Sequence, residues 1–404
     1  MGRNNQTPLL AVVLVLIMGM SGCAGLFDSE DTYEMVPTDL GDVAKRSIGS
    51  PNLEVFSDCD ELENALKQSI EEEARTSLLQ AVDDVYYWGG GIWLEDGAEM
   101  TMDDAGSATS STPPTTRQEG VDYSGTNNQE QGVDEADFVK TNGFNIFFVD
   151  SGVLHIMDVP EFGEIEHAST TAIQGNPVAM MLNEENLVVV STVSSWNIDN
   201  DDPLQEAMGW SEDWYGWRTN TLTKFTVFNI SNSSSPEINR ELYIEGYYMT
   251  AREVAGTVRT VTHTWMDIPG LQTWISYPEG YWSSDYTEEE RRNMREAAAQ
   301  DAMEHNQEIM SKITLEDILP QVHERISDEI ITHHMDGDDC SDFAAPEDGF
   351  NRGYTSIFTI DLISEELEFE ADHIVGNWPL VYSSQDTLII TENAWDWWWF
   401  WGHD

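Results

Sequence analysis

The most informative part of the sequence is residues 132–143, which read Gly-Val-Asp-Glu-Ala-Asp-Phe-Val-Lys-Thr-Asn-Gly. A run of strand-forming residues, 144–149, follows at once, and a Ser-Gly pair separates it from a second run, 153–159. Apolar, β-branched and aromatic residues on both sides of a two-residue turn predict two antiparallel strands. The chain therefore enters a β-sheet directly after the motif.

A weak internal repeat extends this pattern toward the C-terminus. Three apolar strands each end with Asp or Asn followed by an aliphatic residue, at 156–159, 227–230 and 359–362. Further apolar strands precede the first two, at 144–149 and 186–191. Each pair predicts the inner strands of a four-stranded sheet, with long loops such as 194–219 making the spacing irregular.

The motif at 132–143 and the strands behind it resemble the opening of a family of secreted archaeal and bacterial β-propeller proteins that are distantly WD40-like. A long helix followed by Thr-Leu-Glu-Asp-Ile-Leu-Pro at 314–320 is also similar to that family. The resemblance covers most of 130–390 and implies an all-β fold, with a β-propeller domain at 131–404. It implies no particular chemistry.

About four blades of ~40–50 residues fit into that domain. Members of the family are longer than this chain, so we expect a propeller that is truncated at residue 404.

Two segments break the strand pattern and predict helices. Apolar residues recur at helical spacing in 58–80, which predicts a short N-terminal helical segment within 58–95. Thr287 and Glu290 are spaced as a capping box and begin a helical insertion that we place at 286–335. A second short helix in the insertion begins after Thr314 and ends at Pro320.

The charged residues of the motif admit a catalytic or a structural interpretation, and we favour the structural one. Asp side chains bond backbone amides in turns, which suits the place where the first strand enters the sheet. Together with the two flanking glycines, the motif residues that we interpret as structural are Gly132, Asp134, Glu135, Asp137, Lys140 and Gly143.

The N-terminus predicts export. Arg3 precedes an apolar run at 9–20, and Met-Ser-Gly-Cys at 20–23 resembles a lipobox, which makes 1–23 a lipoprotein signal peptide and Cys23 the lipidated residue. The alternative is a signal anchor with an incidental cysteine. A tether at 24–57 and a Ser/Thr/Pro-rich flexible linker at 96–130 would follow. We therefore expect a lipid-anchored protein on the extracellular face of the cell membrane.

The remaining cysteines, Cys59 and Cys340, form an even pair in an exported chain, which favours a disulfide. On the chain-entropy model such a long loop would stabilise the fold by roughly 4–5 kcal/mol. The alternative is two unrelated buried thiols.

The composition is strongly acidic. Asp and Glu number 75 against 18 Lys and Arg, a formal net charge of −57. Acid-rich, lysine-poor surfaces resemble those of proteins from salt-loving archaea, and salt screening keeps such chains compact. The absence of a basic stripe argues against nucleic acid as a partner.

The best metal candidates are His333, His334, Asp336 and Asp338. Adjacent histidines on a strand point to opposite faces, so they reach one ion only where the backbone bends. Carboxylates around a glycine suit Ca²⁺. The alternative is a solvated acidic loop that follows from composition. Residues 197–202 form a second oxygen-rich loop with the same two interpretations.

Tryptophans gather in the predicted loops and strand ends, where propellers contact ligands. Trp210, Trp214 and Trp217 are our candidates for binding, while Trp265, Trp274 and Trp282 fall in similar positions. The alternative is that these rings fill gaps between blades.

The sequence contains no nucleophile elbow, P-loop or dinucleotide-binding glycine motif. We expect a non-catalytic module that binds or scaffolds an extracellular protein or glycan. The alternatives are a calcium-dependent extracellular polysaccharide hydrolase or lyase, and a structural component of the cell envelope.

Overall fold

The computed structural model describes residues 40, 52–83, 117–118, 123, 134–183, 185–209, 219, 221–254, 257–335, 340–346, 352–364, 366–383 and 387–392. The predicted signal peptide, Cys23 and most of the predicted tether and linker lie outside these residues. Within the described residues, no helix combines the length and the apolar character needed to cross a membrane.

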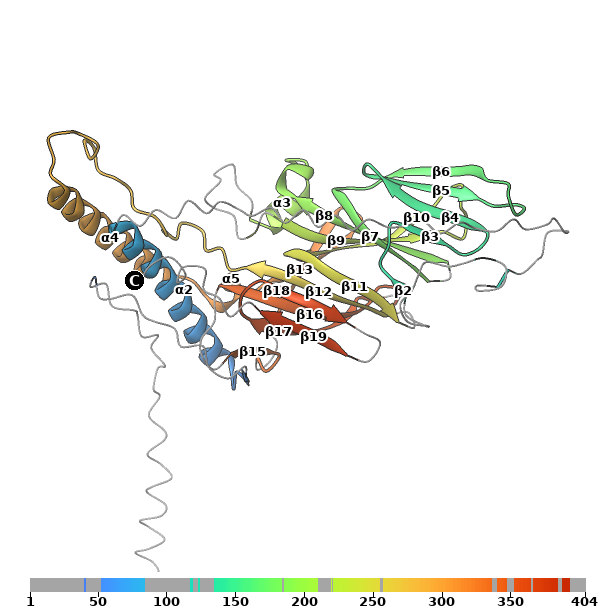
Figure 1. The fold of residues 1–404 in the computed structure, drawn as a ribbon. Coiled ribbons are helices and arrows are strands. Elements are labelled where there is room, and N and C mark those ends of the chain that lie inside the picture. Colours follow the sequence, from blue (N-terminus) through green and yellow to red (C-terminus); the bar gives the residue numbers. More distant parts are fainter. Residues whose placement is uncertain are drawn as a thin grey trace, which may run out of the picture. The chain divides into compact units, whose positions relative to one another are not determined.

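Three four-stranded antiparallel units follow one another along the chain, as expected for propeller blades (Figure 1). Blade 1 contains β3 (Val139–Thr141), β4 (Asn145–Asp150), β5 (Val153–Asp158) and β6 (Glu166–Ala172). Blade 2 contains β7 (Asn176–Asn183), β8 (Asn186–Ser194), β9 (Thr221–Asn229) and β10 (Glu237–Glu245). Blade 3 contains β11 (Tyr247–Val254), β12 (Thr257–Trp265), β16 (Gly353–Asp361) and β17 (Glu368–Val375). A hairpin of β18 (Pro379–Ser383) and β19 (Leu388–Glu392) follows and forms a two-stranded sheet of its own.

The strands predicted to be inner strands are the middle strands of these blades. The run at 144–149 became β4 and the run at 153–159 became β5, and the two pair across the Ser-Gly turn. The strand at 186–191 lies in β8, which pairs with β9, the strand that ends in the repeat at 227–230. The internal repeat therefore marks equivalent strands.

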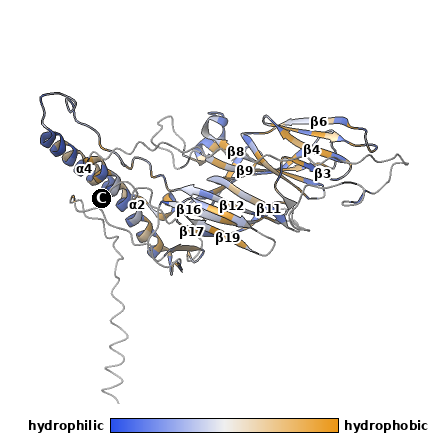
Figure 2. Ribbon diagram, in the orientation of Figure 1, coloured by the Kyte–Doolittle hydropathy of each residue, from blue (hydrophilic) through white to orange (hydrophobic). Residues whose placement is uncertain are grey.

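Blades pack face to face through apolar side chains. One buried cluster joins blade 1 to blade 2, with Phe147 and Ile156 from the former and Val189 and Phe228 from the latter. A larger cluster joins the other face of blade 2 to blade 3. Strand β9 is accordingly buried from Thr221 to Phe228. Figure 2 shows hydrophobic residues concentrated on the strands of the blades.

Each of the two long insertions lies between the second and third strands of its blade. In blade 2, a 3-10 turn (Ser195–Asn197) and α3 (Pro203–Ala207) follow β8. In blade 3, α4 (Glu288–Met310), α5 (Leu315–Ile318), β13 (Gln321–Ile326), β14 (Glu329–His334) and β15 (Phe343–Pro346) separate β12 from β16. In blade 1 the same link is a two-residue turn at 151–152.

The insertion at 286–335 is only partly helical, and the prediction was wrong for its last part. Strand β13 pairs antiparallel with β10, so the β13–β14 hairpin extends blade 2 to six strands. The predicted caps are present, because Glu290 accepts a hydrogen bond from the Thr287 N–H at 2.7 Å and Asp317 accepts one from the Thr314 N–H at 2.9 Å.

The N-terminal segment is held to blade 3 and to the insertion. Strand β1 (Leu53–Val55) pairs with β15, so the end of the predicted tether is a strand. Helix α2 (Cys59–Val82) follows, and its first residue forms the predicted disulfide with Cys340, 281 residues away. At its other end, Arg295 of α4 donates from Nε to the Val82 carbonyl at 2.7 Å. Both ends of α2 are therefore fixed.

The motif at 132–143 runs along the first strands of three blades in succession. Its β2 (Asp134–Glu135) pairs with β11 of blade 3. Asp137 exchanges backbone hydrogen bonds with Met180 on β7 of blade 2, at 3.1 and 2.8 Å. Strand β3 is then the first strand of blade 1. The motif thus pairs with backbone N–H and C=O groups on these edge strands that would otherwise lack a strand partner.

Gly143 ends the motif in a turn that requires glycine. Its φ of 83° lies in the left-handed region, and a Cβ there would come within 2.6 Å of the Tyr123 ring. The preceding Asn142 accepts hydrogen bonds from the N–H groups of Phe144 and Asn145. These contacts explain the Thr-Asn-Gly end of the motif by backbone geometry.

Candidate functional site

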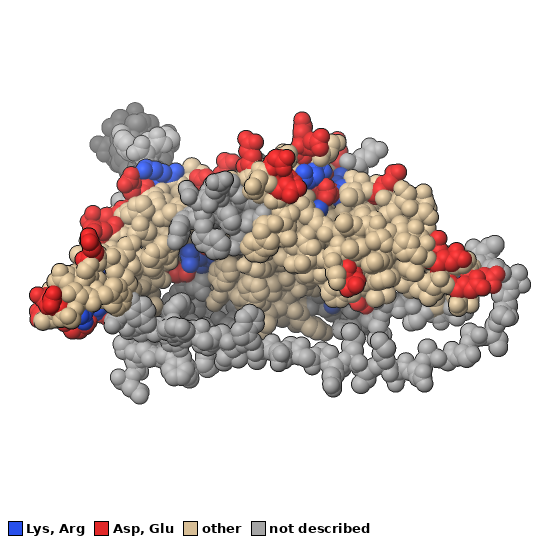
Figure 3. Space-filling view, turned by 90° about the horizontal axis from the view of Figure 1, so that it is seen from above, with Lys and Arg blue, Asp and Glu red and all other residues tan. Residues whose placement is uncertain are grey.

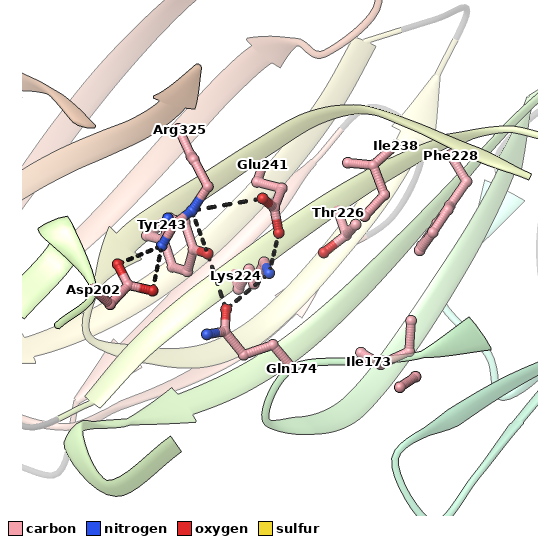
Figure 4. Close-up of a pocket in the computed structure, with 11 residues that line it drawn as sticks. Ile173, Gln174, Asp202, Lys224, Thr226, Phe228, Ile238, Glu241, Tyr243 and Arg325 are labelled. Atoms are coloured by element: carbon pink, nitrogen blue, oxygen red, sulfur yellow. Dashed lines mark hydrogen bonds and ion pairs between the residues drawn. The ribbon is translucent and has the colours of Figure 1, made fainter. Parts of the chain in front are cut away.

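A pocket opens on the face of blade 2 that is turned toward blade 1. Alternate residues of β9 share this face, which places Lys224, Thr226 and Phe228 in one row. Glu241 and Tyr243 of β10 lie opposite Thr226 and Lys224 in the antiparallel register. Blade 1 and the link behind it contribute Ala172, Ile173 and Gln174. The N-cap of α3 contributes Asp202, and β13 contributes Arg325 (Figure 4).

Arg325 holds one end of the pocket. Its Nη2 donates to both carboxylate oxygens of Asp202, at 2.8 and 2.9 Å, and its Nε donates to the Tyr243 hydroxyl at 3.3 Å. The same Nε lies 3.6 Å from a carboxylate oxygen of Glu241. Asp202 also caps α3 by accepting from the Leu204 N–H at 2.9 Å. The guanidinium thus joins the β13 insertion, α3 and β10.

Lys224 completes the polar network. Its ammonium donates to a carboxylate oxygen of Glu241 and to the Gln174 side-chain oxygen. The Tyr243 hydroxyl donates to the same Gln174 oxygen at 2.9 Å. Both Lys224 and Arg325 lie over the Tyr243 ring, at 5.0 and 5.5 Å from its centroid. Gln174 therefore receives two donors at the point where blade 1 meets blade 2.

Burial shifts the proton equilibria of two groups in this network. It lowers the pKa of the Lys224 ammonium, and the neighbouring Glu241 carboxylate works against that shift. Burial also raises the pKa of the Tyr243 phenol, so this hydroxyl keeps its proton and acts as a donor. Besides the Tyr243 hydroxyl and Gln174, the network contains two basic groups, Lys224 and Arg325, in contact with two carboxylates, Asp202 and Glu241.

The other half of the pocket is apolar. Ala172, Ile173, Phe228 and Ile238 line it, and Ile238 is 53 % exposed at the rim. The cavity has a volume of about 250 Å³. Pockets that enclose a whole drug-sized molecule measure roughly 300–1,000 Å³, so this one suits a single ring or side chain.

The structure separates the two histidines of the predicted metal site. On β14, His333 contacts Glu324 at 3.7 Å and the ring of Phe369, whereas His334 contacts Glu316 at 3.3 Å and Gln321. Strand alternation turns the two rings to opposite faces, so they do not converge. Asp336 and Asp338 lie outside the described residues, among which no group of three or more His, Cys, Asp or Glu side chains is arranged to hold a metal ion.

The second oxygen-rich loop, 197–202, has a structural use. Asp202 binds Arg325 and caps α3, and its N–H donates to the Asp199 carbonyl at 3.0 Å. Its carboxylate therefore pairs with Arg325, a cation of the chain itself.

The predicted binding tryptophans Trp210, Trp214 and Trp217 lie outside the described residues. Trp265 packs edge-on against His263, with ring centroids 4.8 Å apart. Trp282 is 75 % exposed and contacts Tyr277 at a tilt and Tyr281 edge-on, and Trp274 is also exposed. The described tryptophans thus include two exposed rings and one that packs against its own strand.

The residues of the motif lie on the first-strand edges, away from the pocket. Asp137 accepts a hydrogen bond from the Phe138 N–H at 2.6 Å, which is the backbone bonding expected of it. Lys140 is buried in β3. Gly132 lies outside the described residues, and of Asp134 and Glu135 the structure describes the backbone.

Sequence reasoning missed the residues of the pocket except Asp202, which belongs to the second oxygen-rich loop. One signal was present, because the chain has few lysines and Lys224 stands within an apolar strand, where an unpaired ammonium would be costly. A lysine in that position predicts a neighbouring acidic partner, and the half-buried Glu241 is that partner.

A family model described as a β-propeller domain matches residues 123–402. The chain belongs to the β-propeller domain family. The match spans the three blades, both insertions and the β18–β19 hairpin, and propellers of this kind serve in general as binding or scaffolding modules. No curated protein and no solved structure matches the chain.

Acidic side chains outnumber basic ones on the visible surface of this β-propeller protein. Figure 3 shows Asp and Glu in several groups, mostly toward the ends and edges of one face, with Lys and Arg in a few small groups. Several of the described cations contact acids on the same or a neighbouring element, such as Lys67 with Glu63 and Arg352 with Glu73. The basic residues thus act largely within the protein.

Proposed function

We propose that this β-propeller is a lipid-anchored module on the extracellular face of the cell membrane that binds a protein or glycan without catalysis. The observation that carries the proposal is the pocket between blades 1 and 2, where charged, hydroxyl and apolar groups converge in a concave site. The lipobox-like Met-Ser-Gly-Cys at 20–23 supports the anchor, and the disulfide between Cys59 and Cys340 is consistent with an oxidising location.

The pairing within the pocket supports binding over hydrolysis. Glycosidases use two carboxyl groups in different roles, one of which must be protonated to act as the acid. Here Asp202 and Glu241 both contact cations of the chain, so neither carboxyl group is free to act on a substrate. The acidic surface also disfavours nucleic acid as the partner.

The pocket lies where insertions from two blades meet, so a bound ligand would contact residues of both insertions. Asp202 caps the short helix that follows β8, and Arg325 enters from the long insertion of blade 3. Insertions on a rigid scaffold are where binding proteins vary their specificity. Both insertions therefore meet at the site.

The test is an array of extracellular polysaccharides and secreted proteins probed with the full chain and two variants. Ile238→Trp enlarges a half-exposed side chain at the pocket rim and should abolish binding by filling the opening. Ile331→Trp is the matched control, because Ile331 is 42 % exposed on β14 of the same six-stranded sheet and does not line the pocket.

Binding that survives in Ile331→Trp and is lost in Ile238→Trp supports the proposal. Equal binding by both variants would place the ligand elsewhere on the molecule. Release of new reducing ends from a polysaccharide would instead support the hydrolase.

A further inference from the structure

One polar group in the pocket has no partner. Thr226 is 3 % exposed, and its Oγ1 has no hydrogen-bond partner among the described residues. Figure 4 shows this side chain in the pocket, between the polar residues around Lys224 and the apolar pair Phe228 and Ile238. A buried hydroxyl without a partner destabilises the folded chain, and a ligand that supplies the missing bond recovers that loss.

The charged groups around Thr226 already compensate one another. Asp202 is bound through both oxygens to Arg325, and Glu241 contacts Lys224 and Arg325. An anionic or cationic ligand would have to displace one of these pairs and leave its former partner unpaired in a buried site. The net charge of the chain, −57, also repels anions at long range.

A neutral hydroxyl meets no such obstacle. It donates to carboxylate oxygens and accepts from ammonium or guanidinium groups, so it can join an existing ion pair without breaking it. The pocket presents both kinds of partner within one small cavity, together with Gln174 and the Thr226 hydroxyl. Several hydroxyls on one ligand would therefore be satisfied together.

The apolar side of the pocket adds a second requirement. Phe228, Ile173 and Ile238 offer a surface that suits C–H groups, directly beside the polar network. A sugar ring combines a C–H face with hydroxyls around its edge, and a cavity of about 250 Å³ is the size for one ring.

We infer that the pocket binds a single ring of a neutral sugar, with the Thr226 hydroxyl as a direct hydrogen-bonding partner. This inference rests on the proposed function and names the class of ligand for the same site. A peptide ligand is the competing class, and the experiment separates the two.

Saturation-transfer NMR with the full chain tests the inference, using the methyl glycosides of glucose, galactose and mannose as neutral probes. Glucuronate and glucosamine serve as the anionic and cationic probes. Thr226→Val replaces the hydroxyl with a methyl of similar size, so the melting temperature should stay the same or rise, because an unpaired polar group is removed. Binding of the neutral probe should weaken at least about tenfold.

Thr262→Val is the matched control. Thr262 is fully buried on β12, its Oγ1 also lacks a partner among the described residues, and it does not line the pocket. Its replacement should change the melting temperature as Thr226→Val does and leave the binding of the probe within about twofold of the parent chain.

Binding of a neutral probe that is lost in Thr226→Val and kept in Thr262→Val establishes the inference. Equal binding by both variants overturns it. If the neutral probes fail and the array shows a charged glycan or a protein whose binding Ile238→Trp abolishes, the inference fails and the proposed function stands. If neither experiment shows a ligand, both fail.

Discussion

Arg325 of β13 and Asp202 at the start of α3 are joined by two hydrogen bonds, at 2.8 and 2.9 Å, although 123 residues separate them in the chain. The pair links the insertion of blade 3 to the insertion of blade 2. Its side chains are 15 % and 16 % exposed, so the bond forms in a largely dry environment at the edge of the pocket.

Replacing Arg325 with Met should therefore destabilise the protein. The change leaves the Asp202 carboxylate buried without its cation, which costs roughly 2–4 kcal/mol in comparable buried pairs. Chemical denaturation measures the loss. The matched control is Arg292→Met, because Arg292 forms a half-exposed pair with Asp83 and its removal should cost much less than the removal of Arg325. Equal losses in the two variants would show that the pair of Arg325 and Asp202 contributes no more to the free energy of unfolding than an exposed pair does.

Buried histidines should make the fold sensitive to mild acid. His373 is buried against Phe343 and within 2.8 Å of the Ser356 hydroxyl, and burial lowers its pKa from 6.5 to about 3. The folded state therefore favours the neutral ring. This contribution to stability is complete above pH 6.5, and it is lost as the pH falls from there toward the folded pKa, by at most about 1.4 kcal/mol per pH unit.

His373→Asn removes this titration and keeps a polar group beside Ser356. Between pH 6.5 and 4.5 the free energy of unfolding of the parent chain should fall more steeply than that of the variant, by roughly 2–3 kcal/mol in total. The exposed His305, replaced in the same way, controls for the loss of a histidine at the surface. Parallel curves for His373→Asn and the parent would refute the assignment.

Removing the disulfide should loosen the protein without freeing α2. The bond between Cys59 and Cys340 closes a separation of 281 residues, and replacing both residues with Ala should lower the free energy of unfolding by roughly 3–5 kcal/mol. The far end of α2 stays attached through Arg295 and the Val82 carbonyl. Rapid proteolysis within α2 should therefore require Arg295→Met as well, and cleavage in the cysteine variant alone would contradict this arrangement.

Salt should stabilise the fold. With a net charge of −57, repulsion within the folded chain weakens as the screening length falls from about 10 Å at 0.1 M to about 3 Å at 1 M salt. The melting temperature should rise equally in sodium chloride and choline chloride over this range. A rise that needs millimolar calcium instead would indicate a specific ion site.

Local patterns in the sequence predicted most of the fold. The hairpin behind the motif, the capping box at Thr287 and the helix behind Asp58 depend on residues close in the chain, and each formed where it was expected. A further regularity went unnoticed, since Ile-Gln-Gly at 173–175 and Ile-Glu-Gly at 244–246 mark equivalent links between blades. Both glycines have φ values in the left-handed region.

The pocket could not be predicted in this way because its residues come together through long-range pairing. Arg325 reaches blade 2 only because β13 leaves blade 3 and pairs with β10. The sequence of residues 321–326 does not indicate which strand it pairs with. The same short segment was assigned to a helical insertion. The adjacent histidines at 333 and 334 misled for a related reason, since a strand turns neighbours apart.

Hydrogen–deuterium exchange of the full chain, with and without the ligand that the array selects, shows directly which segments the ligand covers. We predict slower exchange in the bound state within 172–174, 224–228 and 238–243, the segments that line the pocket between blades 1 and 2. Protection confined to other segments, such as the exposed hairpin of β18 and β19, would contradict the central claim that this pocket is the binding site.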